Sequence, residues 1–271
     1  MTINELLNAL DMPGEVRDQV LRFDQSFDYA QILHLLDGLC NRETWDESRA
    51  RLKTFLREDA RGMKMLACML HCALRTYDEY CRIGIDNQIF TDTMKCFPRF
   101  INEHYSMSGV YAFDRDFWTP RQLGMQLFRI GALEYELYYV DGKKVISMHI
   151  PSDADICEEN CTRSLCQAHA FMERFFVDYQ SVDYVCDSWL LSPVLKQLLP
   201  ETSNILKFQR RFDIRTVQED AMDFIVWVFK TTDQTLETLP ENTSLQRRMK
   251  QYLLDGGKVG AAFGVIENKL A

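Results

Sequence analysis

The sequence has no surplus of positive charge and no long apolar run. Its 271 residues contain 31 Lys and Arg against 40 Asp and Glu, for a net charge of -9. A negative surface repels phosphate backbones, so we expect no nucleic-acid partner. No stretch approaches the roughly 20 apolar residues that span a bilayer, so we expect no membrane partner. The segment Met1–Leu7 carries an acid and no basic flank. It predicts no signal peptide and a cytoplasmic protein.

The nine cysteines show no spacing typical of a metal site. Thiolates and imidazoles bind zinc when four ligands converge tetrahedrally, and residues along one continuous helix do not converge in this way. Two groups lie along predicted helices in this manner: Cys157, Cys161, Cys166 and His169, and then Cys68, His71 and Cys72. We therefore expect reduced, buried thiols and no metal ion.

The first 110 residues show helical periodicity without strand alternation. The segment Thr2-Ile3-Asn4-Glu5 is a capping box, in which the Thr2 oxygen accepts from the amide of residue 5 and the Glu5 carboxylate reaches back. Apolar residues then recur at helical spacing, and the most apolar stretch covers residues 65–80. These features predict an N-terminal helical bundle over residues 1–110.

The pattern changes near residues 106–109. Residues 128–139 alternate, Asp141-Gly142 is a tight-turn signal, and residues 145–150 return as the partner strand. Helices are then predicted over 165–176, 192–199, 203–212 and 243–254, with strands at 184–190, near 214, at 224–229 and at 259–266. This order predicts an α+β fold, in which residues 111–271 form a mixed β-sheet covered by helices.

Five segments of this second region resemble, in their order and spacing, those of one known family. They are Phe113–Gln122, Phe128–Leu137, His149–Ser152, Cys186–Pro193 and Ser203–Phe212. The family is that of bacterial acyltransferases with a helical N-terminal domain and a GNAT-like C-terminal domain. The resemblance implies a GNAT-like β-sheet domain and transfer of an acyl group from acyl-CoA or a related thioester. The acceptor would be an amine on a small molecule that the sequence does not identify.

One segment departs from the GNAT pattern. GNAT enzymes hold the pyrophosphate of coenzyme A with a glycine-containing loop at a helix start. Here Pro151–Thr162 has no glycine and four acidic residues, which oppose an incoming pyrophosphate. Arg163 and Arg211 are the predicted cofactor-binding cations, and the alternative for Arg211, beside Arg210, is a solvated or salt-bridged position on an amphipathic helix. The departure supports a second hypothesis, a non-catalytic GNAT-like module that senses a ligand or binds another protein.

Three residues are candidates for catalysis. Glu136 shares one strand face with Glu134 and is a candidate general base, although a solvated outer face is the alternative. His149 is a candidate acid, base or ligand anchor, or else a structural histidine that fixes a turn. Ser188 lies where the resemblance implies that one strand splays from its neighbour, and its hydroxyl is a candidate donor to a leaving thiolate.

Two aromatic residues are predicted to line the substrate or cofactor site, Tyr135 and Trp189. The alternatives are that Tyr135 faces the core, that Trp189 packs in the core and that Ser192 caps the following helix. The acceptor, the acyl chain and the oligomeric state do not follow from the sequence.

Overall fold

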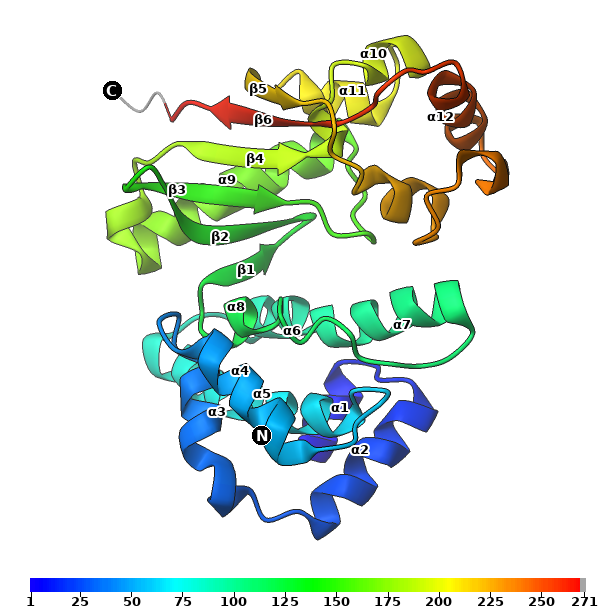
Figure 1. Ribbon diagram of the computed structural model, residues 1–271. Coiled ribbons are helices and arrows are strands. Elements are labelled where there is room, and N and C mark those ends of the chain that lie inside the picture. Colours follow the sequence, from blue (N-terminus) through cyan, green and yellow to red (C-terminus); the bar gives the residue numbers. More distant parts are fainter. Residues whose placement is uncertain (269–271) are drawn as a thin grey trace. The chain divides into compact units, whose positions relative to one another are not determined.

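The computed structural model describes residues 1–268 and divides the chain into two compact units, Met1–Ile130 and Gly131–Ala271 (Figure 1). The division lies beyond the boundary that the sequence predicted at residue 110. Within residues 1–268, no helix combines the length and the apolar character needed to cross a membrane.

The segment after residue 110 packs on the helices, which explains the later division. The buried carboxylate of Asp116 accepts from Arg49 at 3.1 Å and forms an ion pair with Lys53 at 2.7 Å. The amide of Phe113 donates to the carbonyl of Arg61 at 2.8 Å. The sequence boundary followed the loss of helical periodicity, whereas these contacts join an irregular segment to the first unit.

A long central helix, α5 (Met63–Ile83), organises the first unit. It contacts α1, α2, α3, α4, α6 and α8, and its residues 65–70 are all buried. The capping box at Thr2 and Glu5 is present as predicted, with both reciprocal hydrogen bonds. The remaining elements are α1 (Ile3–Ala9), α2 (Gly14–Ser26), η1 (Tyr29–Ile32), α3 (Leu33–Leu39), α4 (Trp45–Leu56), α6 (Asn87–Met94), α7 (Cys96–Ser108), α8 (Pro120–Leu123) and β1 (Leu127–Ile130).

The second unit contains a mixed sheet and its covering helices. Its strands are β2 (Leu133–Val140), β3 (Lys143–His149), β4 (Tyr184–Ser188), β5 (Asp213–Gln218) and β6 (Ala261–Ile266). Their order in the sheet is β2-β3-β4-β6-β5, and β3–β4 is a parallel pair, whereas the other neighbours are antiparallel. The predicted hairpin turn is present, because Asp141 and Gly142 both have positive φ, at 50° and 76°.

Helices complete the second unit. The longest, α9 (Glu158–Phe175), lies behind the strands in Figure 1. The others are η2 (Val177–Tyr179), η3 (Trp189–Leu191), α10 (Leu195–Leu198), α11 (Asn204–Gln209), η4 (Ile225–Phe229), η5 (Leu236–Thr238) and α12 (Ser244–Leu254).

Two sequence expectations need correction. The strand expected at 224–229 is a π-helical turn, η4, whose Phe224, Ile225 and Phe229 are buried in a core cluster with α10 and α12 residues. A short apolar run does not distinguish a strand from a buried helical turn. All nine cysteines are free thiols, but four of them are not buried: Cys81 and Cys166 are exposed, and Cys40 and Cys157 are partly exposed.

Candidate functional site

Two parallel strands separate at their carboxyl ends. The last β3–β4 pair is Ser147↔Val185, yet β3 continues to His149 and β4 to Ser188. β4 stays paired with β6 as far as Ser188. In residues 1–268 the β3–β4 register includes no pair beyond Ser147 and Val185. Beyond this pair the described ends of β3 and β4 are not paired with each other in the register. The family resemblance predicted a splay of neighbouring strands at this end of β4.

Glu136 and His149 meet beside this separation. Nε2 of His149 lies 2.9 Å from Oε2 of Glu136, and the two side chains are 25% and 4% exposed. The solvated outer face that was the alternative for Glu136 is thus excluded. An ionised carboxylate only accepts hydrogen bonds, so this contact orients the imidazole with its proton on Nε2. A carboxylate–imidazole pair of this kind is typical of general acid–base sites.

The strand register assigns the other candidates to one face of the sheet or the other. Side chains alternate along a strand, and register partners point to the same face. Glu136 is paired with Ser147, and Ser147 with Val185. His149 and Asp187 each lie two residues further along. Glu136, His149 and Asp187 therefore share one face, which we call the polar face.

Tyr135 and Ser188 lie on the opposite face. Tyr135 is fully buried, and its hydroxyl is 2.8 Å from Ser164 Oγ on α9. Burial raises the pKa of this phenol. Ser188 Oγ accepts from the amide of Leu190 at 3.2 Å and so caps η3. The structure brings Glu136 together with His149 but does not bring either of these two hydroxyls to them.

Trp189 and Ser192 have structural surroundings. Trp189 is partly buried and packs against the core cluster that includes Leu195 and Leu206. The hydroxyl of Ser192 donates to the carbonyl of Val259 at 2.5 Å, and α10 begins without a side-chain cap. The packing alternative for Trp189 matches these contacts. The expected helix cap at Ser192 is wrong, because its hydroxyl joins two loops.

The start of α9 combines backbone donors with charges of both signs. Among residues 1–268, the amides of residues 158–160 donate to no protein acceptor. Arg211 Nη2 donates to the carbonyl of Glu158 at 2.9 Å and to Thr162 Oγ1 at 2.8 Å. Lys207 lies 3.9 Å from the Glu158 carboxylate. Two cations of the α11 region therefore reach this turn. Arg211 was a predicted cofactor-binding residue, whereas Lys207 was not, because 49 residues separate it from Glu158.

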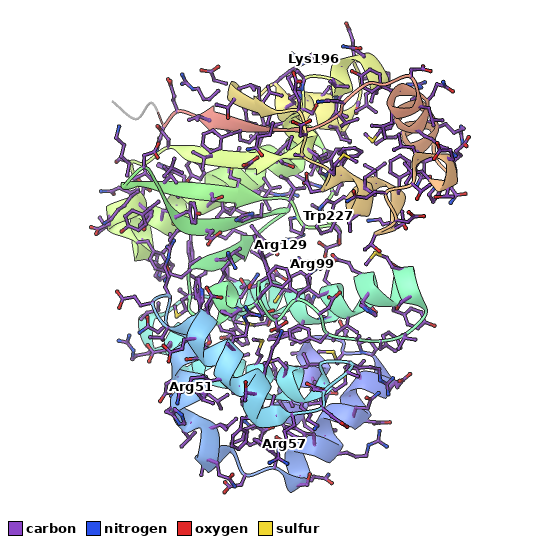
Figure 2. All side chains as sticks on the ribbon, viewed as in Figure 1. Arg51, Arg57, Arg99, Arg129, Lys196 and Trp227 are labelled. Atoms are coloured by element: carbon purple, nitrogen blue, oxygen red, sulfur yellow. The ribbon has the colours of Figure 1, made fainter. Side chains whose placement is uncertain are left out.

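Other cations contribute less to that turn. Arg163 is exposed and is bound along its own helix by Asn160 and Glu159. Lys196, on α10, points outward from the unit in Figure 2. No group of three metal-binding side chains is found in the described part of the chain.

Sequence reasoning missed Asp187, the residue before Ser188. It is exposed, lies on the polar face and accepts from Gln218 Nε2 at 3.1 Å. The available signal in the sequence was the alternation of side chains along the predicted strand. A residue next to Ser188 in a strand must point to the opposite face, but alternation alone does not say which face carries the polar groups.

Two family models match the chain. The model of the N-acyltransferase N-terminal domain matches residues 1–125, and the model of the GNAT-like C-terminal domain matches residues 127–266. A comparison with curated proteins gives no match.

Solved structures of acyltransferases share the fold. One, in complex with decanoyl-CoA and teicoplanin, is 20% identical, with a TM-score of 0.80 over 98% of this chain and 87% of that chain. A second, in complex with CoA and 10C-teicoplanin, gives the same values. A third, in complex with decanoyl-CoA, is 21% identical, with a TM-score of 0.79 and the same coverage.

Proposed function

We propose that the chain is an acyl-CoA-dependent N-acyltransferase, since it belongs to the family with a GNAT-like C-terminal domain, whose model covers residues 127–266. The observation that carries the proposal is the Glu136–His149 pair beside the separated ends of β3 and β4. The nine free cysteines support a reducing compartment, and we place the protein in the cytoplasm.

The donor would lie with its phosphates at the start of α9. The three amides of residues 158–160, together with the helix dipole, favour an anion there. The carboxylates of Glu158 and Glu159 oppose one, and Arg211 and Lys207 offset part of that negative charge. In this proposal the cations replace the help that a glycine loop gives in other GNAT domains.

The Glu136–His149 pair would act on the acceptor. The amine nitrogen attacks the thioester carbonyl and forms a C–N bond, while His149 accepts the proton that the nitrogen loses. Glu136 orients the imidazole and stabilises its charged form through the 2.9 Å contact. The tetrahedral intermediate then collapses, the C–S bond breaks, and the leaving thiolate takes the proton that His149 holds. The products are an amide and free coenzyme A.

Two measurements test the proposal. The first is the melting temperature of the full chain with increasing decanoyl-CoA, which should rise, because a ligand that binds only the folded state stabilises it. The second is release of free thiol from decanoyl-CoA in the presence of a primary amine, with the amide detected by mass spectrometry. The substitution His149→Ala should keep the thermal shift and lower amide formation by about 100-fold or more.

The second hypothesis gives a different outcome. The acidic, glycine-free turn at Glu158 and Glu159 is the feature that favours a non-catalytic module. Such a module would show no stabilisation by decanoyl-CoA at concentrations well above micromolar, or stabilisation without any amide product. Either result would reject the acyltransferase proposal.

A further inference from the structure

Asp187 lies across the strand separation from His149. Ser147↔Val185 is the last β3–β4 pair, and His149 and Asp187 each follow it by two residues on the same face. Had the strands stayed together, these two residues would have been register partners. Because the β3–β4 pairing ends before them, an imidazole and a carboxylate stand on one face of the sheet at its unpaired strand ends.

The surroundings of Asp187 leave its charge available. Its Oδ2 accepts from Gln218 Nε2 of β5 at 3.1 Å, which holds the carboxylate without neutralising it. In the described residues Asp187 makes no ion pair with a lysine or an arginine. Burial raises the pKa of nearby Asp223, and the charge of Asp187 adds to that rise. The field at this end of β4 is therefore negative.

We propose that Asp187 binds the ammonium group of the acceptor across from His149 and so selects acceptors that carry a positive charge. The inference rests on the proposed function. A primary amine is mostly an ammonium ion near neutral pH and must lose a proton before it attacks. A carboxylate on one side would hold the ammonium group, which gives its first proton to solvent before it attacks. The imidazole on the other side would take the second proton, which the nitrogen loses as the C–N bond forms. Asp187 thus determines specificity and has no covalent role.

The experiment compares two nucleophiles in three proteins. Propylamine is cationic near neutral pH, whereas hydroxylamine is neutral there and needs no counter-charge. The test variant is Asp187→Asn, whose amide oxygen keeps the bond from Gln218. The matched control is Asp220→Asn, which removes the same charge from an exposed residue paired with Lys258 at 2.7 Å. Each protein is assayed with decanoyl-CoA for thermal shift and for transfer to each nucleophile.

The expected result is selective. Asp187→Asn should lower kcat/KM for propylamine by about 10- to 100-fold, as expected for loss of one charge-assisted hydrogen bond, mainly by raising KM. Transfer to hydroxylamine and the decanoyl-CoA thermal shift should stay within about twofold of the wild type. Asp220→Asn should match the wild type in all assays.

The contrary results separate the two proposals. Equal loss with both nucleophiles, or no loss with propylamine, overturns the role of Asp187 while leaving the acyltransferase intact. A wild-type chain that transfers to hydroxylamine but to no primary amine also overturns it. A wild-type chain without a thermal shift or transfer to either nucleophile overturns the proposed function and this inference together.

Discussion

Removing the Ser164 hydroxyl should destabilise the second unit more than removing the Tyr135 hydroxyl that it contacts. Ser164 Oγ lies 2.8 Å from the Tyr135 hydroxyl and accepts from the amide of Leu133 at 3.3 Å. Both side chains are fully buried. One serine oxygen therefore joins α9 to two alternate residues of the β2 strand, Leu133 and Tyr135.

The expected losses of unfolding free energy depend on which buried groups lose a hydrogen-bond partner. Ser164→Ala leaves the Tyr135 hydroxyl and the Leu133 amide buried without this hydrogen-bond partner, at about 1–3 kcal/mol each, so we expect a loss of about 2–6 kcal/mol. Tyr135→Phe removes one hydrogen-bond partner of Ser164 and leaves the bond from Leu133 in place, so its loss of unfolding free energy should be about 1 kcal/mol. The double variant should lose less unfolding free energy than the two single variants added together, because no buried Tyr135 hydroxyl is then left without a partner.

The assay must report the second unit separately from the first. Urea unfolding read by hydrogen exchange of peptides from β2 and α9 does so, since each peptide reports its own segment. Cys166→Ala, at an exposed position of α9, is the control and should stay within about 0.5 kcal/mol of the wild type. A loss for Ser164→Ala equal to or below that for Tyr135→Phe would refute the reasoning.

Two further predictions concern titratable groups. Glu136→Gln should lower kcat for amide formation by about 10- to 100-fold, because a neutral amide stabilises the protonated His149 less than a carboxylate does. Unchanged kcat in a thiol-release assay would contradict this. The pKa of Cys40 is lowered by a hydrogen bond from Cys72 and by the charge of Arg75, so its thiolate forms at lower pH than that of a free cysteine. Iodoacetamide labelling followed by peptide mapping should therefore reach its plateau at lower pH for Cys40 than for an unstructured cysteine peptide, and a plateau at equal or higher pH would contradict it.

Local signals predicted local structure well. The capping box at Thr2 and the turn at Asp141-Gly142 depend on residues close in sequence, and both are present. The run 224–229 was misassigned, because a buried π-helical turn and a buried strand are both simply apolar in sequence. Its conformation is determined by packing against α12, which begins at Ser244.

The sequence predicted which candidate residues share a face of the sheet, but not which of the two faces the helix α9 covers. Alternation along β2 placed Glu134 and Glu136 together and Tyr135 opposite them, and the structure has this arrangement. The contact between Glu136 and His149 depends on the register of the hairpin, in which His149 is the partner of Glu134. A sequence does not say which face α9 covers, and α9 decides that Tyr135 has a packing role.

The alternation of side chains along a strand also determines which residues at the end of β4 point to the polar face. Cys186 is fully buried, and the ring centroids of Tyr184 and Tyr135 are 6.0 Å apart. The even-numbered residues of β4 therefore point to the face that α9 covers. Ser188 continues that series and caps η3, whereas Asp187 points the other way, toward the polar face. A shift of one residue thus separates a structural hydroxyl from a carboxylate placed across from His149. In the proposal above the carboxylate binds the protonated amine, whereas the Ser188 hydroxyl caps η3, a role that another N-cap residue could fill.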